Sequence, residues 1–266
     1  MSLFRTIVQR RELLLNLVSR ELKIRYRGSA LGFLWSVLIP LFMALIYVFF
    51  LRLLGGRGVP LADIIIGVFA WQYTVQCVNS GLSAITGNTN LVKKVYFPRI
   101  VLPLSVTAAN LVTYLLSLLV QFPLVAILFH MAGHGFSPMV GLLPLLIIFH
   151  TLFNLALTLF LSSANVYYRD AQHLVGIILS AWFFVSPVMY NLDFVHRMAE
   201  KHPFVLDLYM LNPLAVIATA YRSVITPGVE FPMVPAAGVS VVVCLLGLVL
   251  AYKSFERMQR NFADML

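Results

Sequence analysis

The chain has 266 residues, of which 61% are hydrophobic and 11% are charged, and its formal net charge is +9. A soluble domain is usually about a quarter charged, so the composition excludes an ordinary soluble protein and predicts several membrane spans. The apolar runs are continuous and lack the alternation of a transmembrane β-barrel, so each span is expected to be a helix.

The first 30 residues are too charged for a secretory signal, and the apolar run after them is a full span without a cleavage site. Their apolar residues fall roughly on one helical face, which predicts an amphipathic helix in the inner membrane interface. A simple positive anchor for the first span is an equal alternative. Gly28 and Gly32 then show the GxxxG spacing that lets two helices approach closely. The apolar face comprises Phe4, Ile7, Val8, Leu14, Leu15, Val18 and Leu22.

Six apolar segments are long enough to cross a bilayer as helices. A further apolar stretch, 203–227, is interrupted by Pro203, Pro213 and Pro227, and it is predicted to form an outer re-entrant or interfacial helical hairpin. The predicted spans are residues 31–51, 61–86, 101–129, 138–164, 171–190 and 233–252.

The expected fold class is therefore an all-α polytopic membrane protein that forms a single transmembrane domain over residues 1–266. Its parts are a cytoplasmic amphipathic segment (1–30), a six-helix membrane region (31–252) and a cytoplasmic tail (253–266). With both termini inside, 14 of the 19 Lys and Arg residues lie on the cytoplasmic side. The positive-inside rule favours this topology in a bacterial inner membrane, and it explains the basic charge better than nucleic-acid binding does.

The second predicted span carries a polar stripe, formed by Gln72, Gln76, Asn79 and Ser83 at helical spacing. Polar groups facing lipid are costly, so the stripe is expected to face other helices or a wet cavity. Helix packing and the lining of a path for a hydroxyl-rich cargo both remain open. Aromatic rings that would suit a sugar path lie beside the stripe and near the outer end of the fifth span: Trp71, Tyr73, Trp182, Phe183, Phe184 and Tyr190.

The loop after the second span, residues 88–105, predicts a short amphipathic helix that ends before Pro98. Lys93 and Lys94 occupy its polar face. A helix of two turns is unstable alone in water, so it needs the membrane surface or a partner groove. Either it is an interfacial connector, or it is a coupling helix that docks into a cytoplasmic ATPase. The candidate docking residues are Leu91, Val92, Val95, Tyr96 and Phe97.

Two smaller signals concern helix starts in the second half of the chain. Asp170 is expected to cap the fifth span, and Asn212 followed by Pro213 suits the start of another helix.

Cys77 and Cys244 both fall in predicted spans and are expected to be buried thiols.

Several chemistries have no counterpart in the sequence. There is no P-loop, no HExxH and no CxxC pair, and no acidic residue falls at the middle of a predicted span. His150 is expected to pack through a hydrogen bond, with Asn154 as the candidate partner, rather than relay protons. An outer cluster of mixed charges is read as a solvated loop in preference to a metal site: Asp193, His196, Arg197, Glu200, His202 and Asp207. No catalytic residue, metal or cofactor is therefore expected on this chain.

Five segments of the chain resemble the Wzm-like permeases, the transmembrane subunits of ABC exporters for O-antigen, capsule and teichoic acid. Their order and spacing match the family as well, and together they cover nearly the whole chain. The segments are RELKIRYRGSALGFLWSVLIPL (20–41), NLVKKVYFPRIVLPLS (90–105), NVYYRDAQHLV (165–175), SPVMY (186–190) and LNPLAVIATAYR (211–222).

The resemblance implies a homodimer with two copies of a separate ABC ATPase, which would bind ATP and Mg. It also implies a polysaccharide cargo carried on polyprenyl pyrophosphate or on a phospholipid. On this analogy Arg25 and Arg27 would meet the lipid phosphates at the cytoplasmic mouth, and aromatics of the second and fifth spans would line the path. An integral-membrane enzyme acting on polyprenyl-linked sugars and a non-catalytic scaffold remain alternatives.

Overall fold

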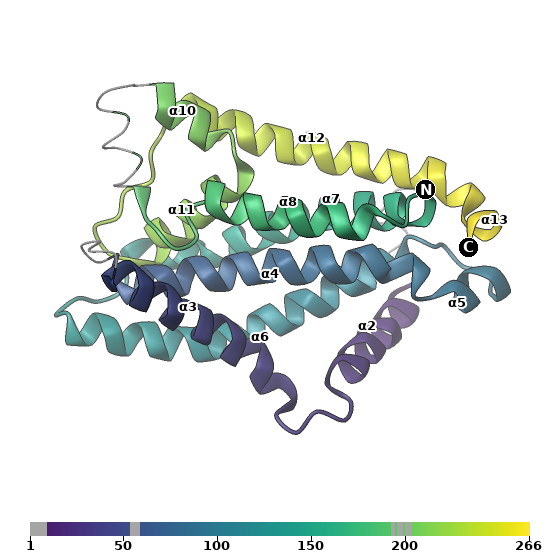
Figure 1. The fold of residues 1–266 in the computed structure, drawn as a ribbon, viewed down its shortest axis with the longest axis horizontal. Helices are drawn as coiled ribbons and strands as arrows, with labels where there is room; N and C mark the ends of the chain where they lie inside the picture. The colour runs from purple at the N-terminus through teal and green to yellow at the C-terminus, as the bar shows by residue number, and fades with distance from the viewer. Residues whose placement is uncertain (1–9, 54–58, 193–194, 196–198, 200–203) are drawn as a thin grey trace.

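The computed structural model describes the chain except for residues 1–9, 54–58, 193–194, 196–198 and 200–203. Throughout the described part, the regular elements are helices and no strand occurs (Figure 1). Five helical segments are long and apolar enough to cross a membrane. The all-α polytopic prediction is therefore confirmed. The segments comprise η1 (Gly32–Leu34) with α3 (Trp35–Leu53), α4 (Leu61–Thr86), α6 (Val101–Met131), η2 (Pro138–Leu142) with α7 (Leu143–Tyr167), and α12 (Pro235–Met258).

The predicted fifth span, 171–190, is wrong in extent. Helix α8 covers Ala171–Val185, which is 15 residues and so about 22 Å long, less than the roughly 30 Å of a bilayer core. The helix ends because Ser186 is extended ahead of Pro187, a residue that disfavours helical geometry before it. Asp170 does occupy the N-cap position of α8, but its side chain makes no capping hydrogen bond there.

The predicted outer hairpin is present as a broken helix pair. Helix α10 (Phe204–Met210) and helix α11 (Pro213–Ile225) meet at an angle of 95°. Asn212 caps α11 as expected, because its side chain accepts a hydrogen bond from the amide of Leu214 at 3.1 Å. Counting this pair as one bent span gives up to six spans in all.

Helix α2 (Arg11–Tyr26) packs against α6, and its contact face differs from the predicted one. Leu17 and Val18 are buried, whereas Leu15, which was assigned to the apolar face, is 65% exposed. The predicted residues Phe4, Ile7 and Val8 lie outside the described part of the chain. The buried face of the helix is therefore set by a tertiary neighbour that periodicity alone does not reveal.

The GxxxG interpretation of Gly28 and Gly32 is wrong. Both residues have positive φ, 76° and 49°, and a Cβ atom added to either would meet nothing within 4 Å. Glycine adopts this backbone conformation at no steric cost. The two residues therefore serve the turn that joins α2 to the first membrane helix, which Figure 1 shows as a sharp change of direction.

Helix α4 lies at the centre of the bundle. Of its apolar stretch 72% is buried, against 17% for the first span, and it packs against α3, α6, α7 and α11. Polar side chains of α7 bond directly to its backbone: Asn165 donates to the Leu82 carbonyl at 2.8 Å. Cys77 and Cys244 are buried free thiols, as expected.

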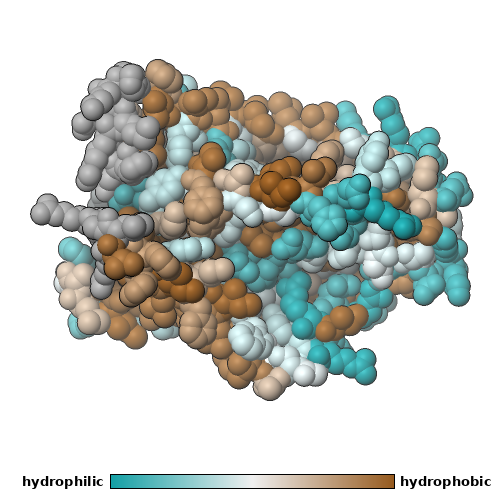
Figure 2. Space-filling model, in the orientation of Figure 1, coloured by the Kyte–Doolittle hydropathy of each residue, from teal (hydrophilic) through white to brown (hydrophobic). Residues whose placement is uncertain are grey.

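The surface is divided along the length of the bundle. Figure 2 shows hydrophobic residues over much of the visible face and hydrophilic residues gathered at one end. That end carries α5 (Thr89–Lys94), η3 (Gln259–Asn261) and α13 (Phe262–Met265) (Figure 1). An apolar belt with a polar end is what a lipid-embedded helical bundle requires.

Candidate functional site

The predicted coupling helix is shorter than the pattern indicates. Helix α5 has six residues, and Val95 after it is extended, with φ −123° and ψ 131°. A β-branched residue such as valine favours this extended backbone conformation. Val92 is buried and Leu91 half-buried in a cluster with the C-terminal helices. These two side chains therefore fasten the segment to the membrane domain.

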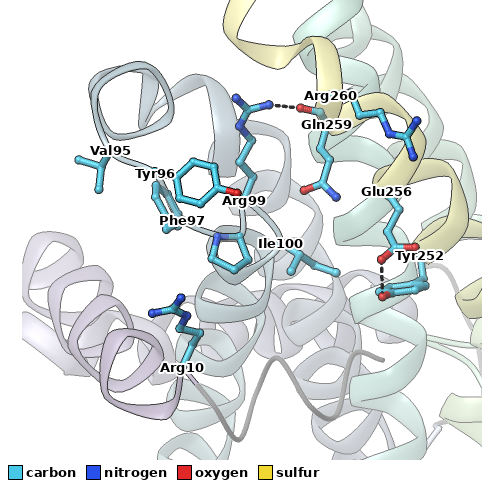
Figure 3. A pocket seen from close by; sticks show the side chains of 11 residues that line it. Arg10, Val95, Tyr96, Phe97, Arg99, Ile100, Tyr252, Glu256, Gln259 and Arg260 are labelled. Atoms are coloured by element: carbon cyan, nitrogen blue, oxygen red, sulfur yellow. Dashed lines mark hydrogen bonds between the residues drawn. The ribbon is translucent and has the colours of Figure 1, made fainter. Parts of the chain in front are cut away.

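The remaining three candidate docking residues follow α5 in extended chain. Val95 is 51% exposed and Tyr96 is fully exposed, whereas Phe97 packs partly against the same cluster. Figure 3 shows the three side chains on the stretch that leads into α6. Tyr96 and Val95 are thus the candidates that present an apolar surface to an external partner.

The two arginines assigned to the cytoplasmic mouth have different surroundings. Arg25 is half-buried, and its Nη1 donates to the hydroxyl of Thr113 on α6 at 3.3 Å. Arg27 follows the end of α2, is exposed, and lines a hollow of about 750 Å³ together with Arg20 and Lys23. Arg27 is therefore the more accessible of the two to a ligand from solvent or the membrane surface.

The polar stripe of α4 divides between the protein interior and its surface. Gln72 and Gln76, together with Tyr73, line a small cavity between α3, α4 and α6. Asn79 and Ser83 are exposed. The cavity measures about 10 Å³, which is room for roughly one water molecule. In this conformation the glutamines therefore border a space too small for a sugar ring.

The candidate path aromatics contact one another and the broken helix pair. Trp71 on α4 meets Phe183 on α8 edge to face, with ring centroids 5.5 Å apart. Trp182 donates its indole N–H to the Asn212 side-chain oxygen at 2.8 Å. Their positions connect α4 and α8 to the N-terminus of α11.

Tyr190, the remaining path candidate, lies in the chain that follows α8. Its hydroxyl donates to the Phe184 carbonyl at 2.9 Å and lies 2.8 Å from the Tyr209 hydroxyl. Burial raises the pKa of Tyr190, so the phenol stays neutral and able to donate. Tyr190 thus ties the end of α8 to α10.

The expected partner of His150 is wrong. Its Nε2 lies 2.8 Å from the Thr74 hydroxyl, and its Nδ1 lies 3.3 Å from the Tyr221 hydroxyl. The imidazole is fully buried, and it reaches across to α4 and α11 rather than along its own helix. Tyr73 stacks on Tyr114 beside it, with ring centroids 4.5 Å apart. These groups form a buried polar and aromatic cluster among four helices.

Sequence reasoning missed a buried arginine. Arg222 on α11 is 2% exposed. Its Nε donates to the Asp63 carbonyl at 3.1 Å and its Nη2 to the Val188 carbonyl at 2.8 Å. The Asp63 carboxylate accepts a hydrogen bond from Thr226 at 2.8 Å. The signal available in the sequence was a lone charge inside the apolar run 213–225.

Most of the outer charged cluster lies outside the described residues, and Asp207 is its member within α10. Among the residues that the structure describes, no group of three His, Cys, Asp or Glu side chains is placed to hold a metal ion.

Comparison with known proteins gives matches over most of the chain. The ABC-2 type transporter family matches residues 12–226. A relative from Myxococcus xanthus, named O-antigen export system permease protein RfbA, is 36% identical over 268 residues, covering 98% of each chain. Two proteins of the same name from Klebsiella pneumoniae are 29% and 27% identical, over 82% and 96% of this chain and 81% and 95% of theirs.

Proposed function

The chain belongs to the ABC-2 type transporter family, and on that premise we propose that it exports a lipid-linked, O-antigen-like cell-surface polysaccharide as the membrane subunit of an ATP-driven complex. The matches confirm the family resemblance seen in the five sequence segments. The observation that carries the proposal is the 36% identity to a curated O-antigen export permease, which extends over 98% of both chains. The multi-pass helical bundle agrees with it.

The energy for export would come from a second polypeptide. The sequence has no G-x-x-x-x-G-K-[ST] loop to cradle nucleotide phosphates, so ATP and Mg would bind to a partner ABC ATPase. The segment from Leu91 to Phe97 is our candidate for contact with that ATPase. Its exposed tip, Val95 and Tyr96, offers the apolar side chains that interface centres favour.

The assembly and its placement are part of the same proposal. Two copies of this chain would pair with two ATPase subunits in the inner membrane, with both termini in the cytoplasm. The bias of 14 out of 19 Lys and Arg residues supports this orientation. The lipid-linked glycan would approach at Arg25 and Arg27, and pass along a path lined by residues of α4 and α8.

The first test is to purify the chain with its partner. We expect an ABC ATPase and a lipid-linked glycan to copurify, the glycan being identified by mass spectrometry. The isolated chain should not hydrolyse ATP, whereas the complex should. Purified complex that holds no ATPase, or export that persists after the chain is deleted, would contradict the proposal and favour an enzyme or a scaffold.

A further inference from the structure

A hollow of about 690 Å³ lies between two segments that are far apart in the sequence (Figure 3). One wall is the stretch 95–100, between α5 and α6. The other is the end of the C-terminal helix, with Tyr252, Glu256, Gln259 and Arg260, and Arg10 lies at the rim. The candidate coupling segment therefore shares its surface with the last turns of the chain.

Direct contacts hold the two walls together. The guanidinium of Arg99 donates to the Gln259 carbonyl at the end of α12. Phe255 and Phe262 are completely buried, and they pack in the cluster that also contains Val92. Tyr167 of α7 donates to the Met258 carbonyl at 3.0 Å. The hollow is thus built on a packed base, and the C-terminal turns position the stretch that carries Tyr96.

The charges around the hollow are predominantly basic. Arg10, Arg99 and Arg260 line it against the single acid Glu256, which accepts a hydrogen bond from Tyr252 at 2.6 Å. The ion pair between Arg20 and Glu21 does not include a lining residue. The hollow therefore presents a net positive charge next to the exposed ring of Tyr96.

We propose that this hollow is a second part of the ATPase docking surface, which receives an acidic side chain of the ATPase beside an apolar one. The inference rests on the proposed function. The hollow is continuous with the coupling segment and lies at the polar end of the bundle, where a cytoplasmic partner has access (Figures 1 and 2). Its charge is complementary to an acidic partner.

Arg260 provides the test, because it is exposed and its side chain makes no hydrogen bond to another residue that the structure describes. Arg257 is a matched control: it is exposed on the last turn of α12 but does not line the hollow. Both arginines are changed to Glu, and Arg260→Lys preserves the charge. Affinity for the ATPase that copurifies with the wild-type chain is then measured in nanodiscs of phosphatidylcholine alone.

We expect Arg260→Glu to weaken ATPase binding about tenfold or more, since it sets like charges against each other. Arg257→Glu should change it by less than about twofold, and Arg260→Lys should retain most of the affinity. Equal effects of the two Glu variants, or none, would overturn the inference while wild-type binding upholds the proposed function. If Arg260→Glu lowered ATPase affinity only in nanodiscs that contain phosphatidylglycerol, that result would instead assign the hollow to lipid headgroups. If the wild-type chain binds no ATPase, both proposals fail.

Discussion

Arg222 is a charged side chain enclosed by apolar helices, and a glycine makes room for it. A Cβ atom added to Gly67 on α4 would lie 2.3 Å from the Val188 carbonyl oxygen and 2.6 Å from Nη2 of Arg222. Those are the two atoms that form the 2.8 Å hydrogen bond. The arginine thus joins α11 to the start of α4 and to the turn after α8.

Gly67→Ala should therefore lower the thermal stability of the purified protein, at a cost of about 1–3 kcal/mol for overpacking. Gly247→Ala on α12 is the control, because its added Cβ meets nothing within 4 Å. Alanine in an open helical position should be neutral or stabilising by up to about 1 kcal/mol. Similar melting shifts for the two variants would show that the Arg222 site does not constrain Gly67.

Arg25 and Arg27 are predicted to recruit an anionic lipid-linked substrate. Arginine binds phosphate bidentately, whereas lysine offers a point charge. Replacing both with lysine should therefore reduce surface export of the polymer while membrane insertion and ATPase association persist. Normal export in the double variant would leave these arginines as topology signals.

A second variant separates substrate binding from packing at Arg25. Its contact with α6 is the Thr113 hydroxyl, which Thr113→Val removes while the arginine remains. If Arg25 serves only to hold α2 on α6, Thr113→Val should reproduce the effect of Arg25→Lys on both export and melting temperature. If it binds phosphate, export should fall only when the arginine itself is changed.

At the scale of single elements, the α5 segment divides into a part that packs inward and a part that faces out. Val92→Ala should destabilise the fold by about 1–3 kcal/mol, because it removes buried methyl groups. Tyr96→Ala should leave the melting temperature unchanged, since the ring is fully exposed, but weaken ATPase association by about 2–4 kcal/mol. Tyr96→Phe, which keeps the aromatic ring and removes the hydroxyl, is the control. An unchanged ATPase affinity in Tyr96→Ala would refute its role in docking.

The elements show which features periodicity and hydropathy predict and which they miss. The span predicted at 61–86 is α4, Leu61–Thr86, because an apolar run between a proline and a polar turn has clear ends. Helix α5 stops earlier than the pattern indicates, because Val95 is extended. The packing of Val92 against the C-terminal helices is a tertiary contact that local sequence does not show. The partners of His150 and Arg222 were missed for the same reason: each lies on an element distant in the sequence.

At the scale of the whole molecule, the apolar belt and the polar end define the axis along which the bundle crosses the membrane. Which end of that axis faces the cytoplasm is predicted by the distribution of Lys and Arg residues. The loop after α6 contains Gly135, and it lies at the opposite end of the bundle from α5 and α13 (Figure 1). Lys94 and Asp264 are exposed at the end that carries those two helices. Proposed cytoplasmic termini require these residues inside and Gly135 outside.

Single cysteines at these three positions test the orientation in intact spheroplasts, with a thiol reagent that cannot cross the inner membrane. The wild-type chain is the background control, because Cys77 and Cys244 are both buried and should stay unlabelled. In intact spheroplasts, we expect the reagent to label Gly135→Cys but neither Lys94→Cys nor Asp264→Cys. Those two cysteines should be labelled once the membrane is permeabilised. The reverse pattern would turn α5, Tyr96 and the basic hollow away from the cytoplasm. An ATPase could then reach none of them, so the docking proposals depend on this orientation.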